Sequence, residues 1–178
     1  MTDTATKNRR EYSRVDVYIP LGCRLLDKEE HGLVKARLSA EVMLADFKLL
    51  PAASNNPQLE SVQLLNQKLD MIIKMVGLQY EGFHALPFKF VSLSGKGLKF
   101  SSSERYSPGD ILECKMMLNL NQSTAIYAYG EVLRVGIQGS SYFVTLSFTA
   151  MDQTIQDKIV QFVFDTEREL IRKRRGQD

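Results

Sequence analysis

The sequence predicts a mainly β fold with helices, in which a small antiparallel barrel or sandwich carries helical segments. From residue 88 onward, runs rich in β-branched and aromatic residues alternate with turn signals such as Pro108-Gly109-Asp110. Between about residues 39 and 85, apolar residues recur instead at intervals of three and four, as they do on one face of a helix. A length of 178 residues suits one domain, so we expect a single domain (1–178) with a helical insertion at 39–85.

The N-terminal part of the chain combines a polar arm with a first strand. Residues 1–11 are mostly polar, cannot bury much surface, and are expected to form a flexible arm. Val15, Val17 and Ile19 then alternate with polar residues, which predicts a strand. Pro20 should mark a break or an edge in this strand, because proline cannot donate a backbone hydrogen bond.

The insertion is predicted to be a helical hairpin. Ser39 is a suitable N-cap for a first helix, which should be short because Pro51 disfavours helical geometry in the residue before it. Pro57 suits the first position of a second helix. We expect that helix to end near Val76, where Gly77 can adopt the left-handed conformation common after helices.

The second helix carries an apolar seam. Five residues follow the alternating spacing of three and four that defines the a and d positions of a coiled coil, namely Val62, Leu65, Leu69, Ile72 and Val76. Further apolar residues widen this face, namely Leu64, Met71, Met75 and Leu78. One short helix cannot cover such a face. Either the barrel of the same subunit covers it, or the same helix of another copy does, in which case the seam is a homo-oligomer interface.

The chain is expected to end in a C-terminal helix at 152–175. Apolar residues in this segment fall on one helical face and charged residues on the other, so the helix should pack across the barrel. Its last turn is basic, Arg172-Lys173-Arg174-Arg175, which suits the negative end of a helix dipole.

Composition excludes several classes of protein. Apolar residues make up 44% of the chain and charged residues 25%, which are values for a globular protein rather than a disordered one. The net charge of +2 and the pI of about 8.5 are too slight for a general nucleic-acid binder, so we expect no nucleic-acid partner. Any anion must be recognised by a few local residues.

The potential metal and redox residues are scattered along the chain. Cys23 and Cys114 share no short spacing with each other or with His31 and His84, so the sequence predicts no metal site and two reduced thiols. No secretory signal and no apolar run of bilayer length is present, from which we expect a cytoplasmic protein without a membrane span. Neither histidine has a nucleophile or acid at a suitable spacing, so we predict no enzymatic activity.

Two polar motifs are the strongest functional signal. The first is Arg10-Glu11-Tyr12-Ser13-Arg14, just ahead of the first strand, and the second is Ser92-Leu93-Ser94-Gly95-Lys96-Gly97, within a later strand region. Together with the order of strands and turns around them, they resemble the two ligand-binding motifs of the PilZ domain family, whose members bind the bacterial messenger cyclic di-GMP. The resemblance implies a six-stranded Greek-key barrel, interrupted here by the helical insertion. It also implies a set of ligand-binding residues, namely Arg9, Arg10, Arg14, Ser92, Ser94 and Gly97.

The chemistry of the ligand explains why such residues would be needed. A planar guanidinium can bind guanine O6 and N7 in bidentate fashion and can also reach a phosphate, which suits Arg10 and Arg14, with Arg9 as an auxiliary cation. In the family the second motif begins with Asp or Asn, which accepts hydrogen bonds from the base. Ser92 stands at that position here, and a hydroxyl serves fewer donors than a carboxylate. We expect this departure to weaken binding by about 1–2 kcal/mol at that contact.

These observations leave two hypotheses for function. In the first, the protein is a PilZ-type receptor that binds cyclic di-GMP, needs no other cofactor, and relays binding to an unknown downstream protein partner. In the second, it is a degenerate PilZ-like adaptor that binds no ligand and instead oligomerises or docks partners through its helical segment.

Overall fold

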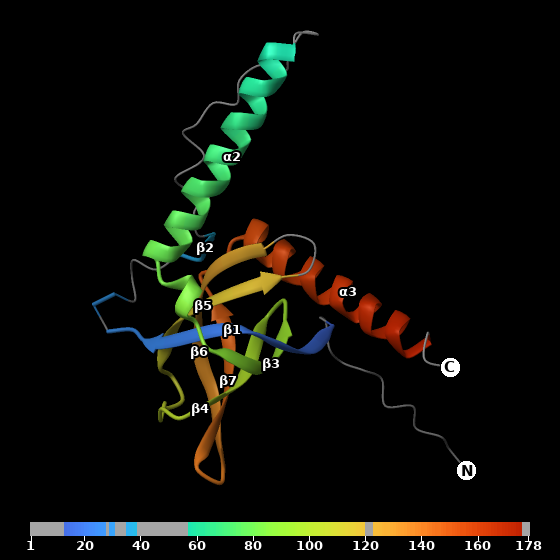
Figure 1. Ribbon diagram of the computed structural model, residues 1–178. Coiled ribbons are helices and arrows are strands. Elements are labelled where there is room, and N and C mark those ends of the chain that lie inside the picture. The colour runs from blue at the N-terminus through green and yellow to red at the C-terminus, as the bar shows by residue number, and fades with distance from the viewer. Residues whose placement is uncertain (1–12, 28, 31–34, 39–56, 120–122, 176–178) are drawn as a thin grey trace.

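The computed structural model describes residues 13–27, 29–30, 35–38, 57–119 and 123–175 (Figure 1). In chain order the described elements are β1 (Arg14–Leu25), β2 (Arg37–Leu38), α2 (Pro57–Tyr80), the short 3₁₀ helix η1 (Phe83–Ala85), β3 (Phe88–Ser94), β4 (Gly97–Ser102), β5 (Ile111–Asn119), β6 (Ser123–Gln138), β7 (Ser141–Thr149) and α3 (Gln153–Arg175). The predicted first helix of the insertion and most of the N-terminal arm, with Arg9 and Arg10, lie outside the described residues.

Six antiparallel strands close into a barrel. The strand order is β6-β5-β1-β3-β4-β7, and β7 pairs again with β6 to complete the circle. The two-residue strand β2 adds to β6 at Tyr127 and Ile126. The closed six-stranded barrel confirms the fold class predicted from the sequence.

Strand β1 pairs with two neighbouring strands, and Pro20 lies where the pairing changes from one strand to the other. Residues 14–20 pair with β3, and residues 21–25 pair with β5. Up to Ile19 the odd-numbered side chains point into the barrel while Arg14, Asp16 and Tyr18 point out, as strand geometry requires. The predicted break at Pro20 is therefore a change of partner within one continuous strand.

The barrel closes at two glycines. A Cβ atom on Gly97 of β4 would overlap the backbone carbonyl of Leu146, and one on Gly130 of β6 would overlap the Leu146 side chain. Strand β7 therefore passes both neighbours at a distance that only glycine permits. Inside, the core includes the fully buried Leu21, Leu93 and Leu112, and α3 covers it with Ile155, Ile159, Phe162 and Val163.

Helix α2 begins at Pro57 as predicted but runs past the predicted end. It continues through Gly77, which is buried within the helix, as far as Tyr80, and the left-handed residue is Gly82, with φ 79°. Glycine at position 77 is tolerated because the helix is held in place by packing just beyond it. The prediction that Gly77 ends the helix is therefore wrong, and Gly82 is the left-handed residue that follows it.

The base of α2 is fixed to the outside of β5 and β6. Phe83 of η1 is buried and meets the ring of Tyr127 edge-on, with ring centroids 5.2 Å apart. The Nζ atom of Lys115 donates a hydrogen bond of 3.0 Å to the carbonyl oxygen of Glu81 and lies 5.1 Å from the Tyr127 ring centroid. From this base the helix projects away from the barrel (Figure 1).

A buried carboxylate ties together the strands beneath this attachment. Glu113 of β5 accepts hydrogen bonds from Arg24 Nε of β1 (2.9 Å) and from the Tyr129 hydroxyl of β6 (3.0 Å). The bonds of Arg24 to Glu113 and to Glu30 raise the pKa of Arg24 above its ordinary value. Each group of the network has a partner, so it is structural.

Candidate functional site

Arg14, from the described end of the first motif, lies beside the second motif on the outside of the barrel. Arg14, the first residue of β1, is exposed and lies directly opposite Ser94 of β3. Two residues further along, Asp16 lies opposite Ser92, and Ser92 in turn lies opposite Lys99 of β4. Directly opposed residues share one face of a sheet, with Cβ atoms about 4.5–5.5 Å apart. The structure thus brings Arg14, Ser92 and Ser94 of the predicted site together.

Ser94 and Gly97 have structural roles in the hairpin between β3 and β4. The Ser94 side chain is 5% exposed, and its hydroxyl donates a hydrogen bond of 3.1 Å to the carbonyl oxygen of Gly97. Gly97 itself makes the close approach to Leu146 described above. These two residues therefore shape the hairpin, whereas Ser92 remains half-buried on the outer surface.

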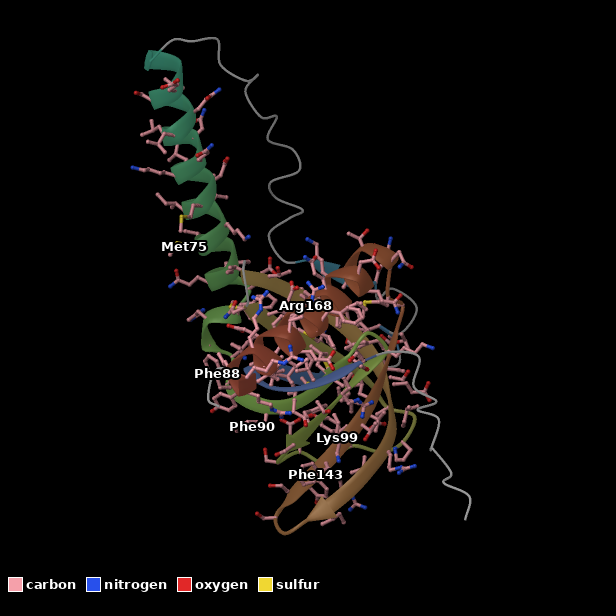
Figure 2. All side chains as sticks on the ribbon, turned by 90° about the vertical axis from the view of Figure 1, so that its right-hand side faces the viewer. Met75, Phe88, Phe90, Lys99, Phe143 and Arg168 are labelled. Carbon is pink, nitrogen blue, oxygen red and sulfur yellow. The ribbon has the colours of Figure 1, made fainter. Side chains whose placement is uncertain are left out.

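Helix α3 borders the same surface. The Ser13 hydroxyl donates a hydrogen bond of 2.8 Å to the Glu167 carboxylate, and Gln156 Nε2 donates one of 3.2 Å to the Gly95 carbonyl. These contacts attach the helix to the start of β1 and to the tip of the β3–β4 hairpin. Figure 2 shows α3, with Arg168, above the strands that carry Phe90 and Lys99.

Aromatic side chains continue this surface along the strands. Phe90 is 75% exposed and lies opposite Tyr18, which is 57% exposed, with ring centroids 4.8 Å apart. The ring of Phe88 also contacts Tyr18, with centroids 5.3 Å apart. The Lys99 ammonium lies 5.2 Å from the Phe143 ring centroid (Figure 2). We call the outer surface formed by six of these residues the candidate ligand face, namely Arg14, Asp16, Tyr18, Phe90, Ser92 and Lys99.

Sequence reasoning missed Asp16, Tyr18, Phe90 and Lys99. The alternation of outward residues at 14, 16 and 18 was readable, as was that at 88, 90 and 92. The register between the two strands could not be read from the sequence, because a shift of pairing by two residues preserves the same alternation.

The seam of α2 is a second exposed surface. Its five residues are between 47% (Val62) and 61% (Leu65) exposed, and Met71 and Met75 beside them are 65% and 59% exposed. Within the described part of the chain, the barrel of the same subunit packs only against Leu78 at the base of this face and leaves the seam uncovered, so that alternative from the sequence is wrong for the seam. Figure 2 shows Met75 well away from the candidate ligand face.

The two cysteines are adjacent, although the sequence suggested unrelated thiols. Cys23 of β1 lies directly opposite Cys114 of β5, and their sulfur atoms are 3.2 Å apart. The contact with Cys23 and complete burial raise the pKa of the Cys114 thiol well above its usual value. Both cysteines are free thiols.

The described residues contain neither a metal-type cluster of side chains nor a helix able to span a membrane. Nowhere in this part of the chain do three His, Cys, Asp or Glu side chains come together as a metal site would require. None of the described helices has the length and apolar character needed to cross a bilayer.

The fold and its two surfaces define a class of protein. It is a closed six-stranded antiparallel barrel with a polar and aromatic outer face, a C-terminal helix across one side and an apolar helix held apart. The family model for the PilZ domain matches residues 67–165, more than half of the chain. The chain therefore belongs to the PilZ domain family, as its motifs suggested.

A solved structure supports the same fold. It is a pathogenic protein from Xanthomonas campestris, described as a tetrameric PilZ domain self-assembled through an unusual helical bundle. It shares 20% sequence identity with this chain, and the match covers 90% of this chain and 91% of that one, with a TM-score of 0.60. At this identity the likeness concerns the fold. No curated protein matches the sequence.

The packing at Gly97 yields a prediction. Gly97→Ala should lower the free energy of unfolding by about 1–3 kcal/mol, because its methyl group has no room beside the Leu146 carbonyl. Chemical denaturation measures the change. Gly136→Ala is the matched control, since Gly136 is also in a strand but has open space around its Cβ position. Equal effects of the two substitutions would contradict the packing role.

Proposed function

We propose that this protein is a PilZ-type receptor that binds cyclic di-GMP on the candidate ligand face and relays binding to a protein partner. The observation that supports it most is the position of Arg14 directly opposite the β3–β4 hairpin that carries the second motif. An exposed guanidinium at that point can contact either a phosphodiester or the O6 and N7 atoms of a guanine.

The positions of Ser94 and Gly97 refine this proposal. Since both residues shape the hairpin, the motif acts largely by presenting the outer surface of β3 and β4 to the ligand. Direct contacts then come from exposed side chains, Arg14 foremost, with Arg9 and Arg10 of the preceding arm as further candidates.

A second function is favoured by the exposed α2 seam. We propose that this protein forms a homo-oligomer through α2. An isolated apolar face of this size on a helix is unfavourable in water. The row of Leu64, Met71 and Met75 beside the seam makes the face too wide for one partner helix, which favours a bundle of more than two helices. The Xanthomonas campestris protein, described as assembling through a helical bundle, supports the same arrangement.

Isothermal titration calorimetry with cyclic di-GMP tests the receptor function. We expect the wild-type protein to bind and to gain thermal stability, because a ligand of the native state must stabilise it. Arg14→Ala should weaken binding at least about tenfold, the loss of one charged hydrogen bond. Arg105→Ala is the control, since Arg105 is exposed in the loop after β4 and should leave the affinity unchanged.

The outcome that contradicts the receptor function is the absence of both heat and thermal shift at high micromolar dinucleotide. Equal weakening by Arg14→Ala and Arg105→Ala would instead indicate nonspecific attraction of an anion. In either case, the hypothesis of a degenerate PilZ-like adaptor would describe this protein better.

Light scattering coupled to gel filtration tests the assembly. The wild-type protein should have a mass of several times the 20.2 kDa of one chain. Leu69→Glu should reduce the mass to that of the monomer, because it buries a charge in the seam. Gln67→Glu adds the same charge two residues away, outside the seam, and should leave the oligomer intact. A wild-type monomer at high micromolar concentration would refute this assembly.

A further inference from the structure

The candidate ligand face contains a carboxylate that the family resemblance does not assign to the site. Asp16 is exposed on β1 and lies directly opposite Ser92, the serine that stands where the family has Asp or Asn. Two directly opposed side chains are close enough to contact the same ligand atoms. The acid missing from β3 is thus present on the neighbouring strand.

The charges around Asp16 restrict what it can bind. Arg14 lies two residues before it on the same face, and Lys99 lies on the far side of Ser92. In an anionic ligand, the phosphodiesters would be attracted to these two cations, and a carboxylate would repel them. Asp16 must therefore face a part of the ligand that donates hydrogen bonds. In cyclic di-GMP these donors are N1–H and the N2 amino group of guanine.

Aromatic residues lie next to Asp16, at the place that the rings of a guanine would occupy if its edge were bound by Asp16. Tyr18 and Phe90 are the next outward pair after Asp16 and Ser92, roughly 6.6 Å further along the strands. The two rings contact each other and remain largely exposed on the barrel surface. An exposed aromatic ring beside a carboxylate fits a purine that stacks on one side and donates hydrogen bonds at its edge.

From this arrangement we propose that Asp16 replaces the missing acid of the second motif, by accepting the N1 and N2 donors of a guanine that stacks on Phe90. This inference rests on the proposed cyclic di-GMP binding and names the residues that make it specific for guanine. It also changes the expectation that Ser92 weakens binding. The carboxylate contact is kept, but it comes from β1 instead of β3.

Titration of an Asp16→Ala variant, which removes both acceptor oxygens, tests the carboxylate. Its affinity for cyclic di-GMP should fall about ten- to hundredfold, the effect of losing hydrogen bonds to a charged group. Its preference for cyclic di-GMP over cyclic di-AMP should fall as well, because adenine has no N1–H or N2 donor. Glu60→Gln, which removes an exposed carboxylate on α2, should change neither quantity.

Ser92→Asp distinguishes relocation of the acid from its simple loss. In the Asp16→Ala background, Ser92→Asp should restore affinity, because it returns a carboxylate to the same point on the face. In the wild-type background it should bring little gain, because two directly opposed carboxylates repel each other. A full gain in the wild-type background, with no effect of Asp16→Ala, would overturn the inference.

A single tryptophan can report the stacking. The chain contains no Trp, so Phe90→Trp introduces one fluorophore at the proposed stacking position. Cyclic di-GMP should quench it, whereas Tyr80→Trp, at a residue 90% exposed at the end of α2, should not respond. Phe90→Ala should weaken binding about five- to hundredfold.

The results separate the two proposals. Absence of binding by the wild-type protein overturns the receptor function and this inference together. Wild-type binding that is lost in Arg14→Ala but unchanged in Asp16→Ala and Phe90→Ala overturns this inference alone.

Discussion

The structure depends on one close approach, that of β7 to the strands on either side of it. Leu146 presses against Gly97 of β4 with its backbone and against Gly130 of β6 with its side chain, and neither position has room for a Cβ atom. The contact joins the last strand to both of its neighbours and converts an open sheet into a barrel without edges. A closed barrel fixes the register of every strand in it, since a slip at one pair must be absorbed by the others.

That register creates the candidate ligand face. Arg14, Asp16 and Tyr18 belong to β1, and Ser94, Ser92 and Phe90 oppose them one by one from β3. The face is supported from beneath by the core, and α3 holds its upper border through Glu167 and Gln156. The apolar seam of α2 lies elsewhere, beyond the attachment of Phe83 to the outside of β5 and β6. Recognition of a ligand and assembly of subunits can therefore use separate surfaces of one small domain.

Sequence patterns predicted the parts of this arrangement that depend on local chemistry. Strand alternation, the turn at Gly109 and the start of α2 at Pro57 follow from properties of single residues and their near neighbours. The end of α2 was misplaced because packing of Phe83, rather than Gly77, decides it. The pairing of Asp16 with Ser92 and of Cys23 with Cys114 depends on register across strands distant in sequence, which no periodicity contains. Gly97 was predicted as a ligand-binding residue, whereas in the structure it makes a close approach to the backbone of Leu146.

The central claim is that one face of the barrel binds the dinucleotide while α2 serves assembly. Hydrogen–deuterium exchange measured with and without saturating cyclic di-GMP tests it most directly, because exchange reports every backbone amide at once. We expect slower exchange in peptides that cover residues 13–18 and 90–99, with unchanged exchange in peptides from 62–76. Protection confined to α2, or no change along β1 and the β3–β4 hairpin, would contradict it.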